Sequence, residues 1–424
     1  MAEKRNGSKS IKALTALSAF LITLDVVVGG YFAAKALKKN NTEETSSVEE
    51  TSEINRVSGT LAAAIDPVTE TTAVPTTEPK DEIKQKIESM SLREKVCQMF
   101  IVRPEELTDG IDTTVASQAT ADKLKEYPVG GLIYFEKNLE SQAQITDVIN
   151  TTKKYAADAG CVPLFYSVDE EGGQVARCAD AVGTVALDSM YYYKGMGTDA
   201  AQSNARMLAG DIAKLGFNLD FAPVADTWSN PSNTVIGTRA YSDDFAETAR
   251  LVEAAVKGFK AGGMCCTLKH FPGHGDTAED SHYSSAVSYR TVDELRANEY
   301  LAFESGINAG ADMVMVGHIT VPDIDELPAT LSEKIIQGEL RGHLGYDGVI
   351  ITDSLGMGAI ANIYSSGDAA VMAIQAGNDI LLTPDNFAEA VAGVEQAVAD
   401  GRLTEERIDE SVKRILTLKK DGIA

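Results

Sequence analysis

The sequence has few cysteines and no paired-cysteine motif, and both shortages exclude a class of protein. Five cysteines in 424 residues are too few for a disulfide scaffold, and Cys265 and Cys266 are adjacent, where a bridge would be strained. We therefore expect free thiols. No Cys-x-x-Cys pair or Cys/His cluster with zinc spacing occurs, so we expect neither a structural metal nor a cofactor.

Positive charge is also scarce. Lys and Arg number 38 against 63 Asp and Glu, which gives a net charge of −25. Such a surface repels a phosphate backbone, so we expect no nucleic-acid partner. Hydrophobic residues make up 44% of the chain and glycines number 35, which is typical of a globular α/β protein with a sizeable core.

A long apolar run occurs only near the N-terminus. Residues 1–12 are basic, residues 13–34 are mostly apolar, and further lysines follow. At 1.5 Å per residue this run reaches about 33 Å, enough to cross a bilayer, so we expect a membrane anchor with the rest of the chain exported. Asp25 interrupts the run and Ala34-Lys35-Ala36 resembles a cleavage site, so a cleaved signal and secretion are the alternative.

Residues 35–80 are rich in Thr, Ser, Glu and Pro and contain almost no aromatic residues. This composition cannot bury enough apolar surface to offset the entropy of ordering, so we expect a disordered linker. The remaining residues, 81–424, are predicted to form a single catalytic domain.

In that domain, helix-like stretches alternate with short apolar runs. Eight such runs occur, at residues 98–102, 131–135, 163–168, 217–222, 264–268, 312–316, 348–352 and 379–382. The stretches between them, such as 244–261, are long enough for crossover helices. The pattern predicts a (β/α)8 TIM-type barrel, with an open doubly wound sheet as the alternative.

Polar residues follow each of these runs. Barrel enzymes build their active sites at the carboxyl ends of the strands, so we expect these side chains to form a ring at one face. They are Arg103, Glu136, Asp169, Glu170, Glu171, Asp226, Lys269, His270, His318, Asp353 and Thr383.

The densest motif is Lys269-His-Phe-Pro-Gly-His-Gly, followed by Asp280-Ser-His282. His270 and His274 have the i, i+4 spacing of a helical zinc site, but the Pro-Gly pair between them disfavours a helix. Each histidine could instead be a polar loop residue that only satisfies backbone groups.

Three further motifs place charged residues after apolar runs. Val349-Ile-Ile-Thr-Asp353-Ser delivers a carboxylate at the end of a buried-type strand, although Asp353 could instead cap the following helix. Ser167-Val-Asp169-Glu-Glu-Gly-Gly is followed by Arg177, and Ile236-Gly-Thr-Arg239-Ala-Tyr carries a second arginine. Surface ion pairs are the alternative for these two.

Taken in this order, the four motifs resemble glycoside hydrolase family 3, in its β-N-acetylglucosaminidase branch, over about residues 87–419. The resemblance implies a retaining, exo-acting glycosidase that uses the barrel without the second sandwich domain of many members. It implies that Asp353 is the nucleophile and that His282 with Asp280 forms the acid/base dyad. The sugar-contacting positions map onto Asp169, Arg177, Arg239, Lys269 and His270.

Two positions depart from the family pattern. Gln174 stands where a basic residue is common, and Ser354 follows the nucleophile where the next few residues often include an acid. Neither residue touches the implied chemistry.

The residue types suit the implied reaction. A carboxylate can attack the anomeric carbon, and an imidazole with a reference pKa near 6.5 can donate and then accept a proton at neutral pH. Asp280 would fix the tautomer of His282. The cations of the motifs could bind sugar hydroxyls or an anionic muropeptide, so we expect a carbohydrate substrate and a membrane contact through residues 13–34.

Other functions remain open from the residues alone. A lysine at a strand end, Lys269, could form a Schiff base, and a tethered glycan-binding protein without turnover is also possible. On the same scaffold, a β-glucosidase or a phosphorylase is an alternative, because a histidine acid/base avoids repelling an incoming phosphate.

Overall fold

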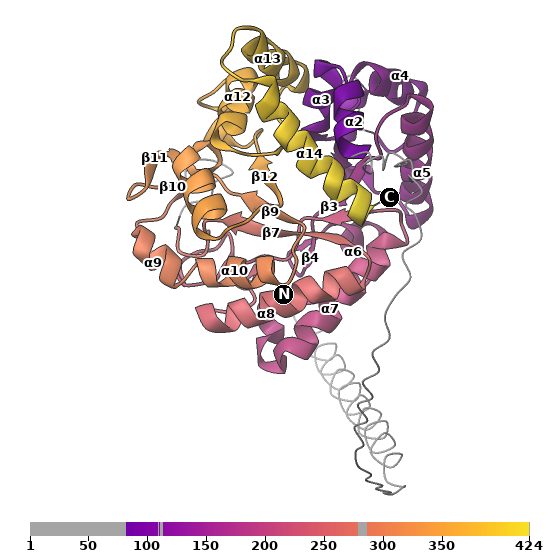
Figure 1. The fold of residues 1–424 in the computed structure, drawn as a ribbon. Coiled ribbons are helices and arrows are strands. Elements are labelled where there is room, and N and C mark those ends of the chain that lie inside the picture. The colour runs from indigo at the N-terminus through magenta and orange to yellow at the C-terminus, as the bar shows by residue number, and fades with distance from the viewer. Residues whose placement is uncertain (1–81, 109, 111–112, 279–285, 424) are drawn as a thin grey trace, which may run out of the picture. The chain divides into compact units, whose positions relative to one another are not determined.

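The computed structural model describes residues 82–108, 110, 113–278 and 286–423 (Figure 1). The expected basic flank, anchor and linker, residues 1–80, lie outside the described residues, and so do Asp280 and His282. Within the described part of the chain, no helix combines the length and the apolar character needed to cross a bilayer.

Eight parallel strands close into a barrel in the order β1-β13-β12-β9-β7-β6-β3-β2. Each overlaps one of the eight predicted runs, and their order along the chain is their order around the barrel. The predicted (β/α)8 barrel is therefore confirmed, and the open sheet is wrong because β1 pairs with β13. The strands are β1 (Phe100–Val102), β2 (Gly131–Ile133), β3 (Phe165–Val168), β6 (Leu219–Asp220), β7 (Cys265–Phe271), β9 (Met313–Val316), β12 (Val349–Ser354) and β13 (Ile380–Leu382).

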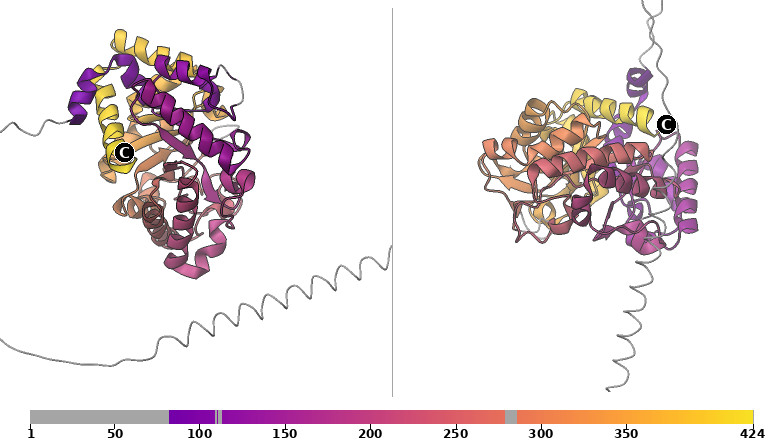
Figure 2. Two further views of the ribbon diagram at one scale, coloured as in Figure 1. Left: turned by 90° about the vertical axis from the view of Figure 1, so that its right-hand side faces the viewer. Right: turned by 90° about the horizontal axis from the view of Figure 1, so that it is seen from below.

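Helices surround the barrel strands, as the views in Figures 1 and 2 agree. The predicted helix at 244–261 is confirmed as α8, which begins after Asp244, whose side chain accepts a hydrogen bond from the backbone N–H of Glu247. The helices are α2 (Glu82–Ser89), α3 (Leu92–Gln98), α4 (Gln118–Glu126), α5 (Gln142–Asp158), α6 (Arg177–Val182), α7 (Gly197–Ala213), α8 (Phe245–Ala261), α9 (Val292–Ala297), α10 (Tyr300–Asn308), α11 (Gly358–Ala361), α12 (Ser366–Ala376), α13 (Phe387–Ala399) and α14 (Glu405–Gly422).

Short elements lie between these helices and strands. A hairpin of β4 (Glu170–Gly172) and β5 (Val175–Ala176) follows β3, and β8 (Ala286–Val287), β10 (Ile319–Val321) and β11 (Asp325–Pro328) form a small sheet. The 3-10 helices are η1 (Pro104–Leu107), η2 (Glu136–Asn138), η3 (Met190–Met196), η4 (Gly237–Arg239) and η5 (Ala329–Leu331). The segment η6 (Lys334–His343) is a π-helix.

The barrel strands are buried on both faces, which explains their nearly continuous apolar sequence. In these strands only Asp353 and Ser354, the last residues of β12, are partly exposed. All five cysteines lie in the described part of the chain and are free, as expected.

The amino-terminal end of the barrel contains a buried lysine. Lys419 of α14 is 3% exposed, and its Nζ donates to Oε1 of Gln98 at 2.9 Å and to the carbonyl of Gly130 at 2.8 Å. It also lies 4.9 Å from the centre of the Phe165 ring. Burial lowers the pKa of Lys419 to about 7.

This burial makes the stability of the protein depend on pH. The unfolded chain, with a lysine pKa near 10.4, binds a proton that the folded chain lacks between about pH 7 and 10. Over that range, wild type should therefore gain stability relative to Lys419→Met, on the order of 1 kcal/mol per pH unit. Urea unfolding at pH 7, 8 and 9 measures the difference. Lys413→Met changes an exposed position of the same helix, so its stability difference from wild type should not vary with pH. If the difference between wild type and Lys419→Met does not vary with pH either, the lowered pKa of Lys419 is contradicted.

Candidate active site

A cavity of about 260 Å³ lies at the carboxyl end of the barrel. Six of the predicted site residues line it, namely Asp169, Arg177, Arg239, Lys269, His270 and Asp353. Asp169, Lys269, His270 and Asp353 reach it from strand ends, as the ring of polar strand ends predicts, whereas Arg177 comes from α6 and Arg239 from η4. Asp280 and His282 lie outside the described residues.

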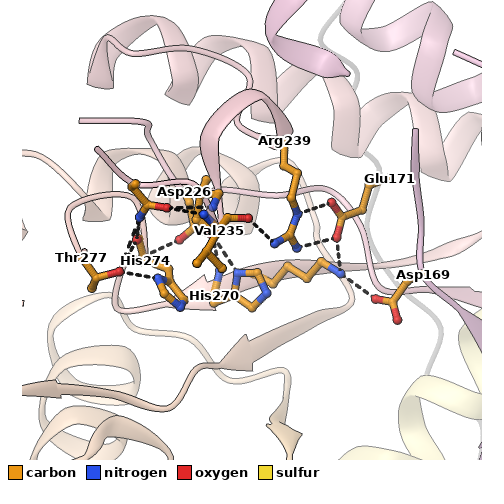
Figure 3. Close-up of polar contacts among 11 residues, drawn as sticks. Asp169, Glu171, Asp226, Val235, Arg239, His270, His274 and Thr277 are labelled. Atoms are coloured by element: carbon orange, nitrogen blue, oxygen red, sulfur yellow. Dashed lines mark hydrogen bonds and ion pairs between the residues drawn. The ribbon is translucent and has the colours of Figure 1, made fainter. Parts of the chain in front are cut away.

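Lys269, near the end of β7, is shared by two carboxylates, those of Asp169 and Glu171, which are labelled in Figure 3. Its Nζ donates to Oδ1 of Asp169 at 2.6 Å and is paired with Oε1 of Glu171 at 2.7 Å. Burial alone would lower the pKa of Lys269, but the charges of Asp169 and Glu171 raise it above its usual value. Lys269 is therefore an ammonium ion at neutral pH, and the Schiff-base alternative, which needs a neutral amine, loses support.

Arg239, from η4, lines the cavity but uses three of its five guanidinium hydrogens on protein acceptors. Its Nε and Nη2 donate to the two carboxylate oxygens of Glu171, each at 2.8 Å, and its Nη1 donates to the carbonyl of Val235 at 3.0 Å. The bidentate face of the guanidinium is thus occupied by a protein carboxylate. Only the remaining Nη hydrogens can serve a ligand, and a sugar contact through them stays a prediction.

Glu171 is the site residue that the motif analysis undervalued, since it appeared there only as a polar strand end. Burial alone would raise its pKa, but Arg239 and Lys269 lower the pKa of Glu171 below its usual range. Its spacing of two residues from Asp169 could have indicated that it belongs to the site. In an extended segment, residues two apart point to the same side, so Glu171 follows Asp169 toward Lys269.

His270 is oriented by a buried acid. Oδ2 of Asp226 accepts the backbone N–H of His270 at 3.2 Å and lies 2.7 Å from its Nδ1, while Oδ1 accepts the backbone N–H of His274 at 2.6 Å. Burial alone would raise the pKa of Asp226, but the charge of His270 and these hydrogen bonds lower it. A carboxylate at Nδ1 assigns the proton to that atom and leaves Nε2 to face other partners.

The two histidines of this motif do not form a helical zinc site, because His270 belongs to strand β7. The Nδ1 of His274 is instead 2.7 Å from Oγ1 of Thr277. In the described ranges, no three His, Cys, Asp or Glu side chains are grouped as metal ligands would be.

Arg177 is the first residue of α6, and Glu170 caps that helix. The carboxylate of Glu170 accepts the backbone N–H groups of Cys178 at 2.7 Å and Ala179 at 3.0 Å. Burial raises the pKa of Glu170 to about 7 although both hydrogen bonds favour its charged form. The cap fixes the start of the helix and, with it, the place from which Arg177 reaches the cavity.

Asp353 is the last residue but one of β12 and lines the cavity. Its Oδ1 accepts the backbone N–H of Ser354 at 2.7 Å. The helix-cap alternative is wrong, because α11 begins after Met357. Its neighbour Ser354 is held by His318, whose Nε2 lies 2.8 Å from the Ser354 carbonyl, and by the hydroxyl of Thr383 at 2.7 Å.

Thr383 has a φ of 36°, which is uncommon for a residue other than glycine. Backbone strain of this kind persists only where surrounding contacts enforce it, and it is common at functional sites. Here it aims the Thr383 hydroxyl at the residue that follows Asp353.

The model of the glycosyl hydrolase family 3 N-terminal domain matches residues 91–418 of the chain. A β-hexosaminidase of Stenotrophomonas maltophilia (strain R551-3) is 36% identical over 296 residues, which cover 68% of this chain and 86% of that protein. β-Hexosaminidase A of Pseudoalteromonas piscicida is 33% identical over 325 residues, or 70% of this chain. The chain spans only 54% of that longer relative.

Solved structures resemble the same region. A family 3 β-N-acetylglucosaminidase from Paenibacillus sp. str. FPU-7 aligns with a TM-score of 0.74 and 38% identity, over 78% of this chain and 62% of that one. The β-N-acetylhexosaminidase of Beutenbergia cavernae DSM 12333 aligns with a TM-score of 0.70 and 29% identity, over 78% of this chain and 99% of that one.

The buried position of Asp226 leads to a prediction about stability. In Asp226→Asn, an amide N–H₂ would face N–H groups that now donate to a carboxylate, so the free energy of unfolding should fall by about 2–4 kcal/mol. Denaturant unfolding measures this loss. The control is Asp244→Asn, because Asn caps a helix as well as Asp does and should change stability little. A variant of Asp226 as stable as wild type would refute the prediction.

Proposed function

Because the chain belongs to glycoside hydrolase family 3, in its β-N-acetylglucosaminidase branch, we propose that it is a retaining, exo-acting glycosidase that releases terminal β-linked N-acetylglucosamine. The proposal is carried by one observation: β12 brings Asp353 into the same cavity as the Lys269, His270 and Asp169 side chains. Relatives of which this chain covers 85–86% are named β-hexosaminidases.

The cavity residues fit a two-step displacement. A carboxylate oxygen of Asp353 bonds to the anomeric carbon as the bond to the leaving oxygen breaks, and His282 gives that oxygen a proton. Water then attacks the anomeric carbon, His282 takes its proton, and the ester to Asp353 breaks with net retention. The roles of His282 and Asp280 rest on the family resemblance, since both lie outside the described residues.

The remaining cavity residues suit a neutral sugar with several hydroxyl groups. Lys269 can donate to hydroxyls, whereas the partly exposed carboxylate of Asp169 and the unprotonated Nε2 atom of His270 can accept from them. Arg177 adds a cation at the side of α6. A cavity of about 260 Å³ is below the roughly 300–1,000 Å³ of pockets for larger ligands, which supports cleavage of one terminal sugar at a time.

The setting of the enzyme is a further part of the proposal. The apolar residues 13–34, flanked by basic ones, support a membrane anchor, and the polar residues 35–80 support a tether to a domain outside the cytoplasm. Cell-wall glycans and muropeptide fragments would be the accessible substrates there.

Asp353→Asn should reduce hydrolysis of an aryl β-N-acetylglucosaminide by about 10³-fold or more, because the glycosyl ester can no longer form. In wild type, a 5-fluoro glycosyl fluoride should label the peptide that contains Asp353, as detected by mass spectrometry. Asp347→Asn changes an exposed acid before the start of the same strand and should keep full activity. Undiminished turnover by the Asp353 variant would exclude this residue as the nucleophile. Product analysis in phosphate and phosphate-free buffers distinguishes hydrolysis from phosphorolysis.

Cell fractionation tests the membrane contact. The full chain should sediment with membranes and resist carbonate washing, while a chain lacking residues 1–39 should be soluble and equally active. Protease added outside intact cells should remove the activity if the domain is exported. A soluble mature chain that begins after Ala36 would instead indicate a cleaved signal, and protease-resistant cytoplasmic activity would contradict export.

A further inference from the structure

The carboxylate of Glu171 is shared by two cations of the cavity. Its Oε1 is paired with Nζ of Lys269 at 2.7 Å and accepts Nη2 of Arg239 at 2.8 Å, while its Oε2 accepts Nε of Arg239 at 2.8 Å (Figure 3). We propose that Glu171 is a positioning residue that holds Lys269 charged and keeps both Lys269 and Arg239 aimed at the sugar. The inference rests on the proposed function, because it assigns a task to the substrate pocket.

The two acids around Lys269 differ in what they can offer a ligand. The side chain of Glu171 is 3% exposed and both of its oxygens already accept hydrogen bonds, whereas that of Asp169 is 19% exposed. Asp169 can therefore meet a hydroxyl group directly, and Glu171 acts on the ligand through its cationic partners. Two of the three ammonium hydrogens of Lys269 are directed at these two acids. The direction of the third hydrogen is thereby fixed, and this is the hydrogen left to donate to a ligand.

The local charges balance only when Glu171 is ionised. Lys269 faces the cation of Arg239, the carboxylates of Asp169 and Glu171, and the more distant Asp220. Arg239 lowers the pKa of Lys269, and the two near carboxylates raise it. Without Glu171, Lys269 would keep only Asp169 as a near carboxylate and would still face the cation of Arg239, on which the charges of Asp226 and Asp169 act. This loss would favour the neutral amine at Lys269.

The chain around Glu171 supports its contact with η4. Glu171 lies in the first strand of the β4–β5 hairpin, whose turn uses positive φ angles of 85° at Gly172 and 61° at Gly173. Beside this turn, Nε2 of Gln174 donates to Oγ1 of Thr238, the neighbour of Arg239, at 3.2 Å. Gln174, a departure from the family pattern, thus ties the hairpin to the segment that carries Arg239.

A matched ion pair outside the cavity separates positioning from plain stabilisation. Nε and Nη2 of Arg296 donate to the two oxygens of Glu339 at 2.9 Å and 2.8 Å, with the same fork geometry as Arg239 and Glu171. Glu339 is 7% exposed and does not line the cavity. Glu339→Gln is therefore the control for the loss of a bidentate pair.

The experiment compares the full-length wild type with Glu171→Gln, Glu171→Asp and Glu339→Gln on an aryl β-N-acetylglucosaminide between pH 6 and 9. We expect Glu171→Gln to raise KM by about tenfold or more with a smaller change in kcat, because binding through two cations is weakened. The ratio of its KM to that of wild type should grow with pH as Lys269 loses its proton. Glu171→Asp keeps the charge, so its KM ratio should be raised but constant with pH.

Glu339→Gln should lower the melting temperature and keep the wild-type KM at every pH. The inference is overturned if Glu171→Gln keeps the wild-type KM, or if its KM ratio does not change with pH. If Glu171→Gln fails to fold, an unchanged KM in Glu171→Asp overturns it as well. A wild type without turnover contradicts the proposed function instead. Calorimetric binding of N-acetylglucosamine then decides the inference: weaker binding by Glu171→Gln supports it and equal binding overturns it.

Discussion

Closure of the barrel is the constraint on which the rest of the structure depends. When β1 pairs with both β13 and β2, every parallel strand has two neighbours, and all eight carboxyl ends are brought to one rim. Strand interiors must then be apolar, because helices cover one face and the barrel core the other. Polar residues are tolerated where strands end, and those positions are where Asp353, Lys269 and Asp169 meet.

The cavity is built from charges that compensate one another. Lys269 and Arg239 are balanced by Asp169 and Glu171, while Asp226 contacts Nδ1 of His270. Such groups would be costly to bury singly, yet together they are hydrogen-bonded and paired. The side chains that can meet a sugar are therefore prearranged, which spares the cost of ordering them when the ligand arrives.

The sequence predicted the barrel strands well, because period and length are local signals. Each of the eight apolar runs overlaps a strand of the barrel, and α8 begins where Asp244 supplies a cap. Six of the motif residues line one cavity. The partner of Arg239 could not be predicted, because a motif identifies a cation but not its partner, and only the folded chain brings it to Glu171, which is 68 residues away.

The amino-acid sequence by itself determined where the strands lie along the chain, the polar residues at their ends and the family, because these depend on residue type and spacing. The ion pairs and hydrogen bonds between side chains of different strands were decided only by the tertiary structure. Burial and distance show that Lys269 is an ammonium ion and that Nδ1 of His270 faces Asp226. They also show that Asp353 does not cap a helix. Those quantities exist only after distant segments have packed together, since charge and hydrogen bonding depend on neighbours in space.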